Sequence, residues 1–288
     1  MLIMMKKILF LVFCTILSFS LTAQNGVPYK IFSAKAKKTN YKKMLKKISK
    51  ADIVLFGEHH NNSIIHWLQL AVTKDAEKSR KLTLGAEMFE ADNQIQLNDY
   101  LAGKIDKKAL DTLARLWPNY KTDYKPLVDF AKENKVKFIA TNVPRRNAKI
   151  VFKKGFEGLD SLSTKEKSWI APLPIKYDKN LPGYVKMLAM MGGHGGDNLP
   201  KAQAIKDATM GYFIHKNLEK GKLFIHYNGS YHSDNYEAIG WYLKKYNPEL
   251  KIVTISTVEQ KDLKRLGKEE KNLADFIIVV PEDMTKTY

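Results

Sequence analysis

Residues 53–60 read Ile-Val-Leu-Phe-Gly-Glu-His-His, an apolar run that passes directly into a polar cluster. A short run of β-branched and aromatic residues bounded in this way is typical of a buried strand in a parallel sheet. Residues 82–87, 136–145 and 223–232 repeat the arrangement, and each ends in polar side chains. In open parallel α/β sheets, ligands bind outside the carboxyl ends of the strands. We therefore expect these four polar ends to form one site.

The rest of the chain alternates between apolar runs and segments with helical spacing. Expected strands cover 52–57, 82–87, 136–142, 223–228, 251–256 and 275–280; expected helices cover 40–49, 91–102, 106–117, 123–134, 201–218 and 234–246, with one more starting at 63. This alternation predicts an α/β fold with a doubly wound, mostly parallel sheet and helices on both faces. The main domain is expected over 51–288. Within it, 103–135 would be a helical insertion, and the Gly- and Pro-broken 147–200 an irregular, lid-like region.

The N-terminal segment 1–23 has the pattern of a secretory signal peptide. Lys6 and Lys7 precede the apolar run 8–21, and small residues follow it. The run is shorter than the ~20 residues that span a bilayer, so we expect export to the periplasm or cell envelope. Phe13 before Cys14 argues against a lipid anchor. Since Cys14 is the only cysteine, cleavage would leave no disulfide or thiolate ligand, and any metal would be held by His, Asp, Glu or Tyr.

The segment 24–50 is expected to be a basic N-terminal helix segment. The chain has a formal net charge of +18, and many of its positive charges lie here: Lys35, Lys37, Lys38, Lys42, Lys43, Lys46, Lys47 and Lys50. Such a segment could attract an anionic membrane surface or acidic ligands. The alternative is a solvated helix face. Aromatic residues do not interleave the lysines, so nucleic acid is not an expected partner.

The polar ends of the strands offer two kinds of chemistry. Gly57 and Gly229 each stand three residues before a histidine, and glycine would let the chain turn sharply off the strand end. The set Glu58, His60, Glu87 and His232 could bind a metal ion, because imidazole nitrogens and carboxylates are common ligands. The alternative is buried ion pairs made for stability alone, which are weak stabilisers.

Four more residues are candidates for lining the same site. Asn142 and Arg145 would offer an amide and a fixed cation to a carboxylate or another oxyanion. His66 could line the site or pack in the core. His194, inside a glycine-rich run, could be a ligand or have no role.

Taken together, these segments resemble the ChaN-like family, the haem-binding uptake branch of the Tiki superfamily. The resemblance runs from about Asp52 to Leu243. It is carried by five segments in order, with His66 after the first and Gln94 after the second: 55–61 (Leu-Phe-Gly-Glu-His-His-Asn), 85–89 (Gly-Ala-Glu-Met-Phe), 140–145 (Ala-Thr-Asn-Val-Pro-Arg), 202–210 (Ala-Gln-Ala-Ile-Lys-Asp-Ala-Thr-Met) and 229–232 (Gly-Ser-Tyr-His). Asn61 and Gly211 depart from the family pattern.

The resemblance implies an α/β fold and an exported protein that binds haem for iron acquisition, with paired haems enclosed by a homodimer. It also implies a tyrosine ligand to the iron and a histidine that helps to hold the propionates. Cofactor-binding residues would come from His60, His66, Asn142, Arg145, His194, Tyr231 and His232. Loop position makes Tyr177, Tyr184 and Tyr231 the candidate tyrosines.

The wider superfamily leaves an enzymatic alternative open. It includes metal-dependent peptidases, as well as erythromycin esterases that use histidine and glutamate without a metal. In a metal-dependent hydrolase, His60, His232 and one glutamate would hold Mn²⁺, Co²⁺ or Zn²⁺, and the other glutamate would act as the base. The catalytic set would then be Glu58, His60, Glu87 and His232.

Overall fold

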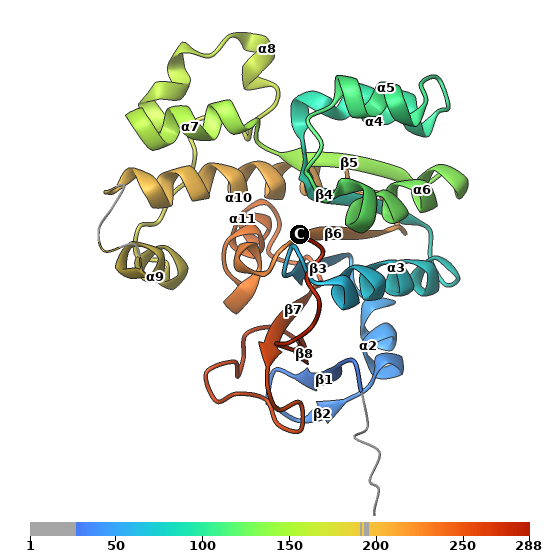
Figure 1. Ribbon diagram of the computed structural model, residues 1–288. Coiled ribbons are helices and arrows are strands. Elements are labelled where there is room, and N and C mark those ends of the chain that lie inside the picture. The colour runs from blue at the N-terminus through green and yellow to red at the C-terminus, as the bar shows by residue number, and fades with distance from the viewer. Residues whose placement is uncertain (1–26, 191, 193–195) are drawn as a thin grey trace, which may run out of the picture.

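A computed structural model describes residues 27–190, 192 and 196–288. The described residues form one eight-stranded sheet with the order β2-β1-β8-β7-β3-β6-β4-β5, flanked by helices (Figure 1). The strands are β1 Lys30–Ser33, β2 Lys38–Thr39, β3 Ile53–Glu58, β4 Leu82–Glu90, β5 Lys137–Asn142, β6 Leu223–Gly229, β7 Ile252–Gln260 and β8 Phe276–Pro281. The six strands from β8 to β5 in this order are parallel. The predicted α/β fold is confirmed.

Helices cover both faces of the sheet, as predicted. They are α2 Tyr41–Ile48, α3 Ser63–Glu77, α4 Gln94–Leu101, α5 Lys107–Leu113, α6 Lys125–Glu133, α7 Arg145–Lys154, α8 Thr164–Lys167, α9 Pro182–Met190, α10 Asn198–Lys216 and α11 Ile239–Tyr246. Strand residues alternate between two cores because successive side chains of a strand point to opposite faces. Val54 and Phe56 pack with residues of α2, α3 and α6, whereas Ile53 and Leu55 pack with residues of α10 and α11.

Two N-terminal strands were not predicted from the sequence. β1 pairs antiparallel with β8 on one side and with the short β2 on the other, so β2 and β1 extend the sheet beyond β8. The lysine-rich composition of 30–39 hides the strand signal, since only Ile31 and Phe32 are buried there. The signal peptide predicted for 1–23 lies outside the described residues. No helix in the described part of the chain is long and apolar enough to cross a membrane.

The regions 103–135 and 147–200 differ in how well the sequence predicts them. The first is helical as expected, and Leu127 and Val128 of α6 belong to the main core. The second was expected to be irregular, but α7, α8 and α9 fall largely within it, together with a 3-10 helix over Phe156–Ser161. The expectation of irregular structure was therefore wrong for these parts. In α7 the buried residues Asn147, Ala148 and Val151 do have helical spacing, but one of them is polar and most of the other residues are exposed, so the apolar signal is small.

The carboxyl ends of β3, β4 and β6 meet at one edge of the sheet. β6 lies between β3 and β4, with Glu58 of β3 opposite Gly229 of β6 and Ala86 of β4 opposite Tyr227 of β6. The polar residues that follow these three strands are thereby brought together. A 3-10 turn over Ser230–His232 continues directly from β6 and carries the second histidine into this edge.

Candidate functional site

Glu58 and His60 form the first half of the site. Glu58 ends β3 and is buried, and its Oε1 lies 2.8 Å from His60 Nδ1. Tyr124 donates to the same oxygen at 2.8 Å, and Gln69 donates to Oε2 at 2.5 Å. These donors fix the carboxylate, which in turn orients the imidazole of His60. The His60 side chain is 32% exposed, and its Nε2 has no hydrogen bond to any described residue.

His232 forms the second half and is held between two buried carboxylates. Its Nε2 lies 3.2 Å from Glu87 Oε1, and its Nδ1 lies 2.5 Å from Asp207 Oδ1. Glu87 also accepts a bond from the backbone N–H of Gly229 at 2.8 Å, and Tyr184 donates to Asp207 at 3.1 Å. Both ring nitrogens of His232 are therefore engaged, whereas Nε2 of His60 has no hydrogen bond to a described residue.

The two glycines of the Gly-x-x-His motifs are needed for close approach and not for a turn. Neither adopts a positive φ, contrary to the expectation that glycine serves a sharp turn here. A Cβ on Gly229 would lie 2.8 Å from His60 Nε2, and a Cβ on Gly57 would lie 2.9 Å from Ser230 Cα. These contacts are shorter than any side chain allows. The glycines thus let the first motif pack directly against the second.

The charges in the cluster stabilise one another. Burial opposes ionisation of Glu87, but His232 and His60 dominate and hold the pKa of Glu87 well below its usual range. Burial likewise opposes the charged form of His232, yet Glu87 and Asp207 raise its pKa to about 10. The pKa of His60 is raised by Glu58 and Glu87 despite burial, and that of Asp207 is raised by burial. At neutral pH, His232 is an imidazolium ion between carboxylates.

The structure brings together the four residues predicted for the centre of the site, Glu58, His60, Glu87 and His232. His66 is buried directly beneath them, with Nε2 3.0 Å from the carbonyl oxygen of His60. His66 is thus buried, as expected for a core residue, and it also contacts a residue of the site, as expected for a residue that lines it.

The other predicted residues stand apart from these contacts. Asn142 ends β5, and its buried Oδ1 has no partner among the described residues. Arg145 begins α7, is exposed, and makes no ion pair within the described part of the chain. Tyr231 turns away from the cluster and donates to Gly183 O at 2.5 Å. The prediction for His194 lies outside the described residues.

Several residues of the site were not predicted. Asp207, Gln69 and Tyr124 each bond directly to the charged cluster. Asp207 lies inside an apolar helix pattern, where a lone carboxylate among Ala, Ile and Met residues is the signal that could have revealed it. The ring of Trp117 lies edge-on to that of His60, with the ring centroids 4.8 Å apart. Trp117 follows α5 in the sequence, and nothing in the pattern of that helix indicated a contact with His60.

The donor set does not form a ready metal site. Among the described residues, no group of three or more His, Cys, Asp or Glu side chains is arranged to hold a metal ion. Carboxylate oxygens of Glu58 and Glu87 point at the imidazole nitrogens of His60 and His232. These oxygens and nitrogens are the atoms that would have to ligate a metal ion. A metal-bound form would require these ion pairs to open.

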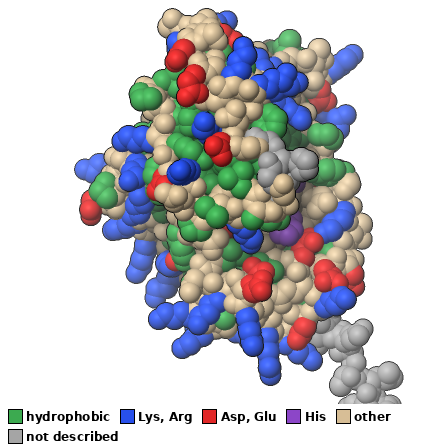
Figure 2. Space-filling view, turned by 90° about the vertical axis from the view of Figure 1, so that its left-hand side faces the viewer, with side chains coloured by type: hydrophobic (Ala, Val, Ile, Leu, Met, Phe, Trp, Pro, Cys, Tyr) green, Lys and Arg blue, Asp and Glu red, His purple; other side chains and the backbone are tan. Residues whose placement is uncertain are grey.

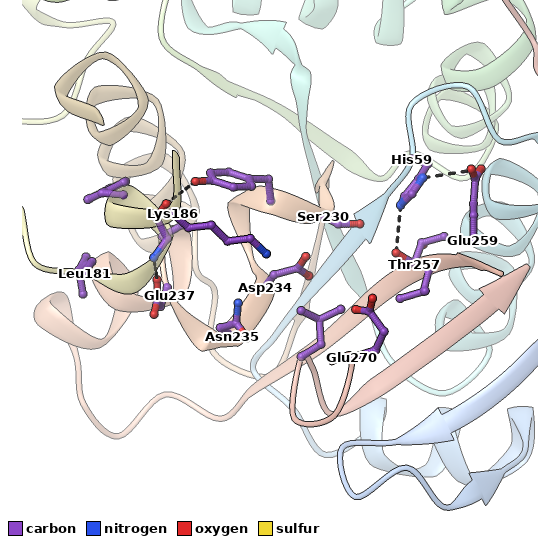
Figure 3. A pocket seen from close by; sticks show the side chains of 16 residues that line it. His59, Leu181, Lys186, Ser230, Asp234, Asn235, Glu237, Thr257, Glu259 and Glu270 are labelled. Carbon is purple, nitrogen blue, oxygen red and sulfur yellow. Dashed lines mark hydrogen bonds and ion pairs between the residues drawn. The ribbon is translucent and has the colours of Figure 1, made fainter. Parts of the chain in front are cut away.

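A separate cavity of about 310 Å³ adjoins the cluster (Figure 3). Its walls include Ser230 and Tyr231 of the 3-10 turn, residues of α9 and the end of β7. Lys186 of α9 extends across it towards Asp234 in Figure 3. Burial raises the pKa of Asp234 to about 7, with the charge of Glu270 adding to the effect. The cavity thus combines apolar walls with a few charged side chains, as ligand pockets commonly do.

The backbone at the rim of this cavity is strained. Asn235, Tyr236 and Ala238 all have positive φ values, of 58°, 62° and 49°. Ala238 combines this φ with a ψ of −116°, a conformation that favours glycine. Helix α11 therefore begins only at Ile239, later than the predicted start at 234. Such strain persists only where surrounding contacts impose it.

The fold and the site define a class of α/β proteins in which paired histidine–carboxylate motifs meet at the carboxyl edge of a parallel sheet. The chain belongs to the family described as haem-binding uptake, Tiki superfamily, ChaN, whose sequence model matches residues 44–243. This match confirms the resemblance drawn from the five ordered segments.

The structure is similar to that solved as cofacial heme binding to ChaN of Campylobacter jejuni, with a TM-score of 0.66 and 17% identity over 88% of this chain and 98% of that one. At this identity the likeness concerns the fold. Protein RETICULATA-RELATED 5, chloroplastic, of Arabidopsis thaliana is 30% identical over 132 residues, which are 43% of this chain and 18% of that protein. An erythromycin esterase structure matches less well, with a TM-score of 0.45 and 11% identity over 87% of this chain and 83% of that one.

Proposed function

We propose that this protein binds haem at the His60 edge of the sheet and serves haem or iron acquisition. The observation that carries the proposal is the half-exposed His60, whose Nδ1 is fixed by Glu58 while its Nε2 has no hydrogen bond to a described residue. An imidazole oriented through one nitrogen by a carboxylate is suited to ligate iron through the other. Membership of a family described as haem-binding gives independent support.

The surroundings of His60 fit a porphyrin. Trp117 lies beside the imidazole and is half-buried, so an apolar ring borders His60. Such surface can pack against a porphyrin face. Bound haem would supply the redox-active iron, and His60 and Trp117 would hold the ring. His232 would not ligate the metal, since both of its nitrogens are taken.

The three candidate tyrosines are less suited to the role of anionic ligand. Burial raises the pKa of Tyr231 to about 12, and Asp207 and Glu237 add to the effect. Burial and Asp207 also raise the pKa of Tyr184, which is buried and donates to Asp207. Tyr177 is more open, but its pKa is raised as well. A tyrosinate would therefore need a rearrangement of this network, which makes His60 the better-prepared ligand.

Haemin titration of the purified protein tests the proposal. We expect a saturable Soret shift at micromolar haemin, and an affinity at least about tenfold lower for His60→Ala, the loss of roughly 1.4 kcal/mol of binding energy. His59→Ala is the matched control, because His59 is bonded to Thr257 O at 3.1 Å and faces Glu259. If the wild type gives no saturable shift, the haem proposal fails. If His60→Ala binds as the wild type does, only the assignment of the ligand fails.

The proposal includes export, a homodimer that encloses the haem, and a place in the periplasm or cell envelope. Its support is the leader pattern of residues 1–23 and the family of the chain. Fractionation of cells that express the full chain, with N-terminal sequencing of the product, tests it. A product that retains Met1 in the cytoplasm would contradict export. Sedimentation with and without haemin measures the oligomeric state.

A hydrolase is the second candidate function. The Glu58–His60 pair favours it, since a histidine oriented by a carboxylate can act as a general base. A metal-dependent form with Mn²⁺, Co²⁺ or Zn²⁺ would additionally need the ion pairs of the cluster to open. Elemental analysis together with a peptide and ester screen tests this alternative. It fails if no substrate is turned over in the presence or absence of added metal.

A further inference from the structure

One surface outside the site has an unusual concentration of positive charge. Residues 27–50 contain nine lysines and no acidic residue, and the first acidic residue of the whole chain is Asp52. By comparison, residues 51–288 have a net charge of only +7. We name the exposed lysines of this segment that form no ion pair with a described residue the lysine face: Lys35, Lys37, Lys38, Lys42, Lys43, Lys46 and Lys50.

The fold fixes the lysine face outward. Met44 and Ile48 of α2 are fully buried in the main core, which leaves Lys42, Lys43 and Lys46 on the opposite side of the helix. Asn40 caps the helix by accepting from Lys43 N, and Tyr41 donates to Asp75 of α3 at 2.8 Å. The helix is therefore a rigid support, and its charges cannot be withdrawn into the core.

Little on the molecule neutralises this charge. Within the described residues, the only ion pair made by a lysine of this segment joins Lys47 to Asp275. Figure 2 shows the side of the molecule that lies on the left in Figure 1. On that side, Asp and Glu side chains lie among the Lys and Arg side chains. Most of the lysine charges around β2 and α2 are therefore not paired with a carboxylate of the described residues.

Two aromatic side chains lie together at the start of the lysine-rich segment. Trp67 of α3 is 55% exposed, and its ring lies 6.4 Å from that of Tyr29, the residue before β1. Exposed Trp and Tyr beside clustered lysines are typical of surfaces that sit at the headgroup level of a bilayer. An exposed tryptophan at this position has no role in the core.

We propose that the lysine face docks the protein onto a membrane surface rich in anionic phospholipid headgroups, with Trp67 inserting at the interface. All positive side chains of residues 27–50 are lysines. Arginine, whose guanidinium group can bind a nucleic-acid phosphate through two parallel hydrogen bonds, does not occur in this segment. The exposed Trp67 comes from another helix and does not alternate with the lysines, which also fits a lipid surface better than a single strand.

Vesicle binding tests the proposal with the chain from Gln24, which contains every described element. Vesicles of phosphatidylcholine alone are compared with vesicles containing phosphatidylglycerol, at low and high salt. The variant Lys42→Glu/Lys43→Glu/Lys46→Glu is compared with Lys149→Glu/Lys153→Glu/Lys154→Glu. The second set lies exposed on α7 and changes the net charge equally.

We expect salt-sensitive binding to the anionic vesicles only, reduced by tenfold or more in the α2 variant and about twofold in the α7 control. A blue shift of tryptophan emission on binding should vanish in Trp67→Phe. Equal losses in the two charge variants would overturn the assignment to this face. Tighter binding to single-stranded RNA than to the vesicles would overturn the choice of partner. None of these results depends on whether haem binds.

Discussion

His232 Nδ1 lies 2.5 Å from Asp207 Oδ1, and this contact joins the turn after β6 to the middle of α10. The other nitrogen of His232 faces Glu87 at the end of β4. One imidazolium thus links a helix and two strands that are far apart in the sequence. Its role in the structure is to hold two buried carboxylates, whereas His60 is the residue that we propose to bind haem.

The raised pKa of His232 predicts that stability falls as the solution becomes alkaline. With a folded pKa of about 10 against the ordinary 6.5, the stabilisation is fully present below pH 6.5 and is lost as pH rises towards 10. On the acid side, stability falls because His226 is buried with its pKa lowered to about 4, and Glu87 must be protonated. We expect maximal stability near pH 6.5 and a loss on the order of 2–4 kcal/mol by pH 10.

Denaturant unfolding at pH 6.5, 8 and 9.5 measures this loss. His232→Gln is expected to be less stable at every pH, because the carboxylates lose their partner, but its stability should change less over this range. A wild-type protein equally stable at pH 6.5 and 9.5 would show that His232 is not held as an imidazolium.

Gly229→Ala is predicted to displace His60. The added Cβ would lie 2.8 Å from His60 Nε2, so the ring must move away from its position beside Glu58. Haemin affinity should drop by about tenfold or more, equivalent to at least roughly 1.4 kcal/mol. Gly240→Ala is the matched control, since its Cβ would meet nothing within 4 Å. Equal affinities for the two variants would contradict the geometry proposed for the site.

Glu58→Gln is predicted to lower the pKa of His60. Burial favours the neutral imidazole, and the charges of Glu58 and Glu87 overcome that effect in the wild type. The variant should also lose about 1–3 kcal/mol of stability, because the new amide cannot accept from all three donors around it. NMR titration of the His60 ring measures the change. Tyr124→Phe, which keeps the charge pair, should leave the pKa raised; a drop of the same size there would contradict the assignment.

Ala238→Gly is predicted to stabilise the protein by about 1 kcal/mol, since glycine adopts this backbone conformation without strain. Thermal unfolding measures the difference. Ala204→Gly, at a buried helical position of α10, should instead be destabilising. A loss of stability in Ala238→Gly would mean that the contacts of the methyl group outweigh the strain.

The central strands and the four residues at their ends could be predicted because both depend on local patterns. Continuous apolar runs identify strands buried on both faces, and parallel pairing brings their carboxyl ends to one edge. The pairing of Glu58 with His60 needs only two residues of separation, so it is nearly fixed once β3 ends at this glutamate.

The remaining partners depend on contacts that no local pattern encodes. Asp207 of α10 reaches His232 from 25 residues away in the sequence, and Tyr124 reaches Glu58 from a π-helical turn over Tyr120–Tyr124. β1 was not predicted because it is stabilised by pairing with β8, which lies more than 240 residues later in the sequence. Each of these contacts becomes visible only when the packing of the whole domain is known.

The pairing of β1 with β8 also has a kinetic consequence. Lys30 lies opposite Val279, so the edge of the sheet closes only after nearly the whole chain has been synthesised. Until then the edges of β1 and β7 that will face β8 have no strand to bond with, and contacts of such long sequence separation form slowly. A chaperone that delays folding of the nascent chain would therefore act on the protein before β8 has been synthesised.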